Sequence, residues 1–578
     1  MDFLPTNLAE GKEKYKDFEE FDVVFITGDP YYDHPLSGVA ILSRLLDSKG
    51  YKVGIIAQPE SDAEFHACGR PRYFFCITSG LLDSMLANYT PMLRQRLDVR
   101  VPERALMVYT QKVKQLFPDC ITIIGGVEAT IRRFTHFDYK DNALRRGIIN
   151  DTKADLLLFG NAERPLLNLL TKMKGLEGHS FSKIRDKLGL SSIDGVSYRI
   201  GKEEIQKSVR KLPSFEECVS DKKKFSLLSR ITWLLPDDAF IEPCGLGLVM
   251  HNRRSHVLQE KEMDLIYSLP FMRTIHPSAK DFEMNSRMTD GLKNSVIMGR
   301  GCWGSCSFCI IPLVQGKEVA VRSKESIVRE IESLFIQGEK KINDLTLPTI
   351  NMYGSHCALY REAEEIFSPI INEKITVYNK KEYCNQICVG CKYRVISDDL
   401  YPLLEEVEKL NRKYEGSSLE LRSAIRHDII LGQKNLFRKI MQFVTRLKIA
   451  PEHLSDKVLK HMNKANREAF VEFLKEYEIV NNEQGTNKNL VPYLIAAHPG
   501  CTIEDMKELK EFCKEQGIFI NLTQVFTPTP GILSTAMYYT GENPLTREPV
   551  YVPRSFREKK DQKAILFNPE EEMVDDNA

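Results

Sequence analysis

The sequence lacks an excess of charge of either sign. Lys and Arg together number 80, as do Asp and Glu, so the 578-residue chain has no net charge at neutral pH. Proteins that bind nucleic acid usually carry a basic excess or a basic face. The charge balance therefore gives no indication of a nucleic-acid partner, which would require a local basic patch.

Long apolar segments are also missing. The first 22 residues contain no apolar signal core, and no run in the chain reaches transmembrane length. Hydrophobic residues make up 42% and charged residues 28% of the sequence, as in ordinary globular proteins. We expect a cytoplasmic protein without a membrane partner. Its length is too great for one core, so two or more domains are expected.

The first part of the chain alternates short apolar runs with helical patterns. The runs are typical of buried strands, and the alternation is typical of a doubly wound parallel sheet over residues 1–175. The predicted strands are residues 22–27, 53–57, 74–78, 121–124 and 156–159. Residues 176–285 are predicted to be a connector with small inserted elements, including a hairpin at 193–199.

The alternation of strands and helices resumes in the second half. Six predicted strands with intervening helices suffice for a partial or full parallel (β/α) barrel over residues 286–545. The strands are residues 295–298, 341–345, 419–425, 444–449, 493–496 and 519–524. Residues 546–578 are predicted to be a polar and partly disordered tail. The predicted fold class is therefore α/β, with a doubly wound sheet followed by a barrel.

Seven of the 14 cysteines lie between Cys302 and Cys391. Disulfides are rare in the cytosol, so such clustering indicates metal ligands or catalytic thiols. Cys302, Cys306 and Cys309 share one short loop directly after a predicted strand, and three thiolates can hold three corners of an iron–sulfur cubane. A structural zinc site would need a fourth ligand, and this loop has none. One iron would stay open to bind a reactant.

The sequence resembles the radical S-adenosylmethionine (radical-SAM) superfamily, and more narrowly its YgiQ-like family. The resemblance covers about residues 20–565. Besides the cysteine loop, it is carried by motifs at residues 33–38, 55–59, 125–128, 250–253, 298–302, 348–353, 450–453 and 496–500.

The resemblance implies a [4Fe–4S] cluster on Cys302, Cys306 and Cys309 whose open iron binds SAM. Reduction would cleave SAM to methionine and a 5′-deoxyadenosyl radical, which abstracts hydrogen from an unknown substrate. The protein would orient the cofactors and exclude side reactions. The resemblance also implies that Phe308 lies against the adenine of SAM. It further implies that an electron donor such as flavodoxin or ferredoxin is a partner.

Reactive groups of a parallel barrel lie at the carboxyl ends of its strands. Arg426 ends one predicted strand and could bind the SAM carboxylate bidentately. Thr349 stands where many members of the superfamily carry a Gly-Gly-Glu loop for the SAM amino group, a motif that this chain lacks. His453 and His498 follow two further strands, where each is either a cofactor contact or an ordinary loop histidine.

A second cysteine group consists of Cys357, Cys384, Cys388 and Cys391. Four thiolates could hold a second iron–sulfur cluster or close a zinc site. Many radical-SAM enzymes use an auxiliary cluster, which favours the first alternative. The spacing looks compressed relative to the YgiQ-like pattern, so the ligand set stays open.

The N-terminal sheet resembles the cobalamin-binding modules that precede several radical-SAM domains. Their fingerprint is Asp-x-His-x-x-Gly, whereas this chain has Asp33 next to His34 and Gly38 four residues later. The spacing is wrong on both sides of the histidine, so we do not expect bound cobalamin.

Two other functions compete with a radical-SAM enzyme of unknown reaction. One is a tRNA-modifying enzyme similar to the methylthiotransferases, which the neutral charge and the absence of an evident basic RNA-binding domain disfavour. The other is a non-catalytic iron–sulfur or zinc protein that transfers electrons or scaffolds partners. Arg426 and the vacant fourth ligand position disfavour it, since a closed site needs neither.

Overall fold

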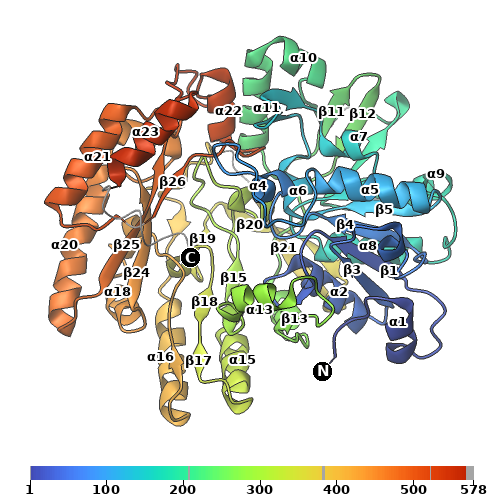
Figure 1. The fold of residues 1–578 in the computed structure, drawn as a ribbon, viewed down its shortest axis with the longest axis horizontal. Helices are drawn as coiled ribbons and strands as arrows, with labels where there is room; N and C mark the ends of the chain where they lie inside the picture. The colour runs from blue at the N-terminus through green and yellow to red at the C-terminus, as the bar shows by residue number, and fades with distance from the viewer. Residues whose placement is uncertain (1, 206–207, 381–383, 521, 568–578) are drawn as a thin grey trace. The chain divides into compact units, whose positions relative to one another are not determined.

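The computed structural model describes residues 2–205, 208–380, 384–520 and 522–567. The chain, drawn as a ribbon in Figure 1, divides into two compact units. Each unit has its own hydrophobic core. Unit 1 comprises residues 1–293, 313–316 and 360–381, and unit 2 comprises residues 294–312, 317–359 and 382–578. In the described part of the chain, no helix has both the length and the apolar character that a membrane crossing requires.

Unit 1 is built on a nine-stranded sheet in the order β10-β11-β12-β9-β8-β5-β4-β1-β3. The five predicted strands are confirmed, and neighbours among them pair in parallel. They are β1 (Val23–Thr27), β3 (Val53–Ala57), β4 (Phe74–Thr78), β5 (Ile121–Ile124) and β8 (Leu156–Leu158). The order β3-β1-β4-β5-β8 is that of flavodoxin-like sheets, which bind ligands at the carboxyl ends of their strands.

Both faces of this parallel sheet are covered, as its uninterrupted apolar strands require. Every residue of β1 is buried. Alternate residues such as Val24 and Ile26 share a core with α5 (Ala105–Leu116). α2 (Gly38–Ser48) contacts β1 and β3, and it also contacts α8 (Glu163–Met173). The sheet is therefore doubly wound, as predicted.

Residues 176–285 contribute more than a connector, because four of their strands extend the sheet. They are β9 (Val196–Ile200), β10 (Arg210–Lys211), β11 (Phe240–Cys244) and β12 (Gly247–His251). β9 is antiparallel to both β8 and β12, so the hairpin predicted at 193–199 is wrong. The alternation of apolar and polar residues at 193–199 is typical of one strand. The strands that pair with it, β8 and β12, lie far away in the sequence, so the segment does not fold back on itself. Because β9 is antiparallel to both of them, β8 and β12 run in the same direction.

The remaining elements of unit 1 are short helices and small strand pairs around this sheet. They are α1 (Leu8–Lys14), β2 (Tyr32–Asp33), α3 (Asp62–Phe65), α4 (Ser84–Asn88), α6 (Gly126–Ile131), β6 (His136–Asp138), β7 (Ala143–Arg145), α7 (Ile148–Thr152), α9 (Phe181–Ile184), α10 (Phe215–Ser220), α11 (Lys222–Leu234), α12 (Glu260–Tyr267), β13 (Thr274–Ile275), α13 (Phe282–Asp290), β20 (Tyr360–Ser368) and β21 (Glu373–Lys380).

Unit 2 contains a succession of parallel strands whose spatial order follows the sequence. β14 pairs with β18, β17 pairs with β23, a bridge from Ile425 to Ile449 leads to β24, and β24 pairs with β25 and β25 with β26. This confirms the predicted partial barrel. The strands are β14 (Ser295–Ile297), β17 (Lys341–Ile342), β18 (Asp344–Thr346), β23 (Ser418–Leu419), β24 (Arg446–Glu452), β25 (Asn489–Ala496) and β26 (Leu522–Val525).

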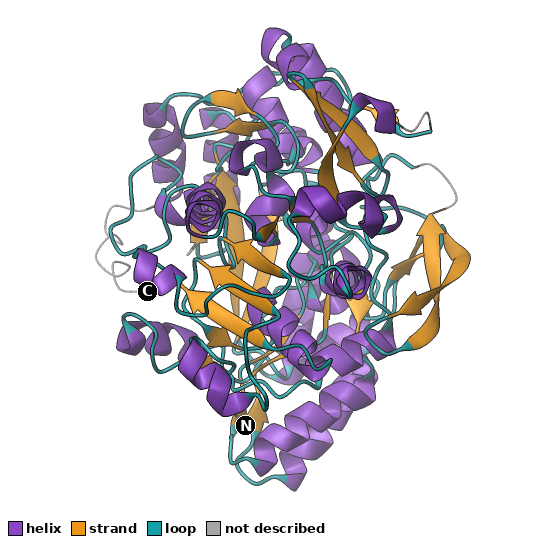
Figure 2. Ribbon diagram, turned by 90° about the vertical axis from the view of Figure 1, so that its right-hand side faces the viewer, coloured by secondary structure: helices purple, strands orange, loops and turns teal. Residues whose placement is uncertain are grey.

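Helices lie between these strands in the sequence, and two more follow the last strand; Figure 2 draws helices in purple and strands in orange. They are α15 (Lys324–Ile336), α16 (Leu400–Lys413), α17 (His427–Ile430), α18 (Lys434–Met441), α19 (Asp456–Met462), α20 (Arg467–Gln484), α21 (Ile503–Glu515), α22 (Leu533–Thr540) and α23 (Phe556–Leu566). α23 lies within the predicted tail, where it contacts α21 and buries Leu566. The disorder predicted for the end of the tail falls on residues 568–578, outside the described residues.

Candidate functional site

The three-cysteine loop follows β14 at its carboxyl end. Backbone hydrogen bonds shape the loop: the amide of Cys309 donates to the carbonyl of Cys306 over 3.1 Å, and the amide of Gly304 donates to Cys302 Sγ over 3.4 Å. The parallel pairing that ends at β14 continues to Met298, whose amide donates to the carbonyl of Thr346. The loop is therefore fixed to the strand that precedes it.

Gly304 lies where two of the thiols and a cation come together. A Cβ added to Gly304 would lie 3.3 Å from Cys302 Sγ, 3.7 Å from Cys306 Sγ and 2.7 Å from a terminal nitrogen (Nη1) of Arg426. Real Cβ atoms essentially never approach another heavy atom within 3.0 Å. This position therefore requires glycine if the arginine is to stay beside the sulfurs.

The described residues contain no group of three or more His, Cys, Asp or Glu side chains arranged to hold a metal ion. The thiols of Cys302, Cys306 and Cys309 do not form such a group either. Burial, followed by repulsion from Cys306, raises the pKa of the Cys302 and Cys309 thiols. Ionising several buried thiols together requires a compensating cation, and iron is one that soft thiolates bind well. The donor set therefore fits an iron–sulfur cluster.

Arg426 brings a buried positive charge to this loop. Its Nε and one terminal nitrogen (Nη2) donate to the two oxygens of Asp428 over 2.9 and 2.7 Å. The other terminal nitrogen (Nη1) is the one beside Gly304. Asp428, Cys306 and Cys302 all raise the pKa of Arg426 against the effect of burial, so the guanidinium stays charged. One edge is thus held by Asp428 while the other faces the cysteines.

The loop after β18 also reaches the cysteines. Thr349 Oγ1 lies 3.9 Å from Cys302 Sγ, and the Met352 sulfur lies 3.8 Å from the same atom. The Asn351 side chain accepts from the amide of Arg426 over 2.9 Å and donates to its carbonyl over 3.2 Å. Thr349 and Arg426 were predicted as site residues because each follows a different strand. The structure brings both of them to the cysteine loop.

Phe308 and His498 meet on the other side of the loop. Their rings are 6.0 Å apart in an edge-to-face arrangement. His498 is fully buried: Nδ1 lies 2.8 Å from the Pro499 carbonyl and Nε2 lies 2.7 Å from Ser534 Oγ. Ser534 in turn bonds Ser307 of the cysteine loop, Oγ to Oγ, over 2.7 Å. Through Nε2 and Ser534, His498 therefore supports the cysteine loop, while Nδ1 bonds its own neighbour in the chain.

His453 is also engaged at both nitrogens. Its Nδ1 accepts from the amides of Leu454 and Ser455 over 2.9 Å each, which places the ring proton on Nε2. That nitrogen faces Cys501 Sγ at 3.5 Å. Burial lowers the pKa of His453 to about 4, so the ring is neutral. The geometry gives His453 a role in holding the turn before α19.

The residue before it, Glu452, lies with His453 at the end of the same predicted strand, but its residue type and position alone assigned it no role. Its carboxylate is 8% exposed and has no hydrogen bond or ion pair with any other described residue. Burial raises its pKa, while Lys464 lowers it. Its backbone is left-handed at φ +67°, where the β24–β25 register shifts, and its charge acts on Cys309. Strain and an unpaired buried charge together are typical of a functional position.

Cys388 of the second cysteine group lies beside the first loop. Its sulfur accepts from Arg394 over 3.2 Å and from Ser305 Oγ over 3.8 Å. Cys357 on β19 (His356–Cys357) pairs with Arg394 on β22 (Arg394–Val395), and the amide of Cys391 donates to the carbonyl of Cys388. These three cysteines are therefore near one another. Cys384 makes no such contact with any described residue, and the choice between cluster and zinc stays a prediction.

The cobalamin-like motif of unit 1 is occupied by internal contacts. Asp33 pairs with Arg44, and both are buried. His34 Nδ1 accepts from the amide of Leu36 over 3.1 Å, and Nε2 lies 3.1 Å from the Lys293 carbonyl. Burial lowers the pKa of His34 to about 3. Neither nitrogen of this neutral ring is left over to ligate cobalt.

We expect Gly304→Ala to lower the cluster content of reconstituted protein without unfolding it. The new methyl group would displace either Arg426 or the loop that carries the cysteines. Iron and sulfide analysis measures the effect. Gly432→Ala is the matched control, because a Cβ there meets only the Ile429 carbonyl at an ordinary 3.6 Å. Equal iron content in the two variants would contradict the crowding argument.

Comparison with known proteins places these features in a family. Residues 3–290 match the family described as Radical SAM N-terminal, and residues 521–572 match a domain of unknown function, DUF3362. A UPF0313 protein of Geobacter sulfurreducens is 36% identical over 98% of this chain and 92% of its own length. Another from Methanocaldococcus jannaschii is 36% identical over 99% and 93%.

Solved structures add a likeness of fold. The radical SAM methyltransferase TsrM of Kitasatospora setae, with cobalamin and a [4Fe–4S] cluster bound, aligns with a TM-score of 0.55 and 12% identity. The alignment covers 96% of this chain and 92% of that one. The family match and the UPF0313 relatives confirm the sequence resemblance: the chain belongs to the UPF0313 family and is a radical SAM enzyme.

Proposed function

We propose that the loop of Cys302, Cys306 and Cys309 holds a [4Fe–4S] cluster with one iron open to SAM. The observation that carries the proposal is the meeting of two of these sulfurs with the charged edge of Arg426 at Gly304. A bound cluster would supply the electron that cleaves SAM and so starts radical chemistry on a substrate. The chain's own residues have to bind SAM, orient it and exclude water.

Opposite charges at neighbouring strand ends suit the zwitterionic end of SAM. The free edge of the Arg426 guanidinium can donate to a carboxylate, and Asp428 fixes its orientation. The unpaired Glu452 carboxylate can accept from an ammonium group or from hydroxyls. Glu452 would thus replace the acidic residue of the missing Gly-Gly-Glu loop.

Thr349 and Phe308 complete the proposed arrangement from either side of the cysteines. Thr349 can bond either a cluster sulfur or SAM. The ring of Phe308 offers an apolar face to the adenine, with His498 behind it. His453 and His498 act by position, since both of their ring nitrogens are already used. An external one-electron donor of the flavodoxin or ferredoxin kind would supply the reducing electron.

Anaerobic reconstitution with iron and sulfide tests the proposal. Reduced wild-type protein should convert SAM to methionine and 5′-deoxyadenosine, because the three thiolates leave one iron open. Replacing Cys302, Cys306 and Cys309 by Ala should abolish this conversion and the reduced EPR signal of the cluster. Cys244→Ala, a change at a half-buried thiol of unit 1, should leave both intact. A wild-type cluster that never yields 5′-deoxyadenosine would overturn the proposal.

The same triple variant addresses the second cysteine group. Iron with sulfide that survives in it would support a second cluster on Cys357, Cys384, Cys388 and Cys391, and stoichiometric zinc would support a structural site. Retention of neither metal would mean that these cysteines are free thiols.

We expect Glu452→Gln to weaken SAM binding by about 10- to 150-fold, the loss of roughly 1.5–3 kcal/mol from one charge-assisted contact. Equilibrium binding of SAM to the reconstituted protein measures the effect. The iron content should not change, because glutamine keeps the size of the side chain.

Glu472→Gln is the matched control for this change. Glu472 is an exposed glutamate on α20, so losing its charge should leave SAM affinity as in the wild type. If Glu452→Gln also binds SAM normally, the ammonium group is held elsewhere and the unpaired carboxylate serves the substrate or only the fold.

We propose that cobalamin is not a cofactor held by His34. The ring is neutral, buried and bonded at both nitrogens within unit 1. Added hydroxocobalamin should therefore show no absorption change that depends on His34. Titration of wild type and His34→Gln measures this. A histidine-ligated spectrum that appears in wild type and disappears in the variant would contradict the proposal.

A further inference from the structure

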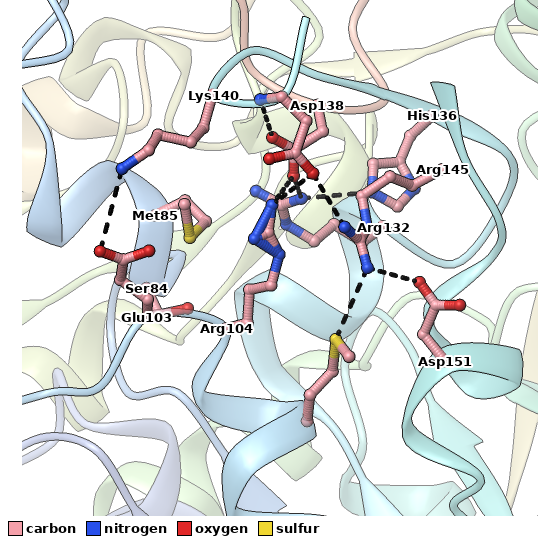
Figure 3. A network of polar contacts seen from close by, with 12 residues as sticks. Ser84, Met85, Glu103, Arg104, Arg132, His136, Asp138, Lys140, Arg145 and Asp151 are labelled. Carbon is pink, nitrogen blue, oxygen red and sulfur yellow. Dashed lines mark hydrogen bonds and ion pairs between the residues drawn. The ribbon is translucent and has the colours of Figure 1, made fainter. Parts of the chain in front are cut away.

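Buried arginines in unit 1 are paired with carboxylates. Removing a guanidinium from water is costly unless an acidic partner and hydrogen bonds compensate for the lost solvation. Three buried arginines follow this rule, and Figure 3 shows one of them, Arg132, with Asp138. The pairs are Arg44 with Asp33, Arg164 with Glu262, and Arg132 with both Asp83 and Asp138.

Arg133, the next residue in the chain, breaks the rule. Its side chain is only 7% exposed, yet among the described residues it has no ion pair and no hydrogen bond. Its guanidinium carbon lies 4.4 Å from the ring centre of Phe134 and 3.9 Å from that of Phe159. The two rings hold the guanidinium through its faces, and such contacts leave the N–H groups at its edge without an acceptor.

Arg254 brings a second cation close to the first. It follows β12, donates to the Leu313 carbonyl, and its Nε lies 4.0 Å from Asp237 Oδ1. Its Nη1 lies 2.7 Å from where a Cβ on Gly160 would stand, so the glycine leaves room for it. The charge of Arg254 adds to burial in lowering the pKa of Arg133. The positive charges of Arg133 and Arg254 therefore lie near each other in a largely buried region of unit 1.

Both arginines belong to one edge of the sheet. Arg133 comes after α6, which follows the carboxyl end of β5, and Phe159 directly follows β8. Since β12 runs in the same direction as β8, Arg254 also follows a carboxyl end on that edge. Ligands of doubly wound sheets bind at this edge.

The nearby carboxylates leave Arg133 without an ion pair among the described residues, although Asp237 lies 4.0 Å from Arg254. Glu242 and Asp237 act on Arg133 at a distance, but neither is within 4.0 Å of it. One oxygen of Glu242 accepts from the amide of Thr135 over 2.7 Å, and the other lies 3.5 Å from His251. Glu242 is therefore committed to other groups, and Asp237 is half exposed.

We propose that Arg133 and Arg254 form a binding site in unit 1 for the oxyanion group, carboxylate or phosphate, of a small molecule. Planar guanidinium groups match the geometry of both oxyanions through paired N–H donors. The site uses none of the cysteines, nor Arg426 or Glu452, so it stands independently of the chemistry proposed for unit 2.

Thermal unfolding of the full-length protein tests the site. Inorganic phosphate and succinate are added separately, with chloride at the same ionic strength as the reference. At least one of them should raise the melting temperature of the wild type, because a ligand that binds only the folded state stabilises it. A larger effect of phosphate identifies a phosphoryl group, and a larger effect of succinate identifies a carboxylate. No effect of either anion would overturn the proposal.

Two substitutions separate a ligand site from a structural role. Arg133→Met should abolish the anion effect while raising the melting temperature of the ligand-free protein, since it removes an unpaired buried charge. Arg254→Met should weaken anion binding about 10-fold or more. Arg96→Met, at an exposed arginine, should change nothing. If Arg133→Met lowers the ligand-free melting temperature and leaves the anion effect intact, Arg133 is structural and the proposal fails.

Discussion

The cost of burying charge at the carboxyl ends of parallel strands governs the chemistry of both units. Strands covered on both faces have only their ends free for polar groups, so functional side chains collect there. Each buried ion then needs a counter-ion. Arg426 has Asp428 on one edge and the cysteines on the other. Glu452 and Arg133, in contrast, have no ion pair or hydrogen bond with any residue that the structure describes. The ligand positions that we propose in the two units are at these unpaired charges.

Much of the fold could be predicted because its signals are local. The parallel strands of unit 1 are continuous apolar runs such as β1, and the cysteine loop of unit 2 comes soon after the short apolar strand β14. β9 to β12 were not predicted as part of the sheet, because a short alternating run such as residues 196–200 does not reveal a partner near residue 250. Local pattern specifies strands, and long-range packing specifies pairing.

Residues of the candidate site could be proposed from the sequence where a residue type alone implies the chemistry. Three closely spaced cysteines and an arginine at a strand end were found in this way, and the structure brings Arg426 and Thr349 to the cysteines. The roles of His453 and His498 could not be read from the sequence, since they depend on which nitrogens are already bonded. Glu452 could have been found from the missing Gly-Gly-Glu loop, which leaves a need for another acid at a neighbouring strand end.

Neither His453 nor His498 is available as a base in such a site. His453 and His498 are both neutral, because burial lowers the pKa of His453 to about 4 and that of His498 to about 3. In each ring, both the nitrogen that carries the proton and the nitrogen with the lone pair bond neighbouring groups of the protein. Neither ring can therefore exchange protons with a bound ligand. Among the described residues, the charges beside the cysteines include the Arg426–Asp428 pair and the unpaired carboxylate of Glu452. An arginine stays protonated throughout the physiological range, so Glu452, whose pKa burial raises, is the group whose charge the environment can still alter.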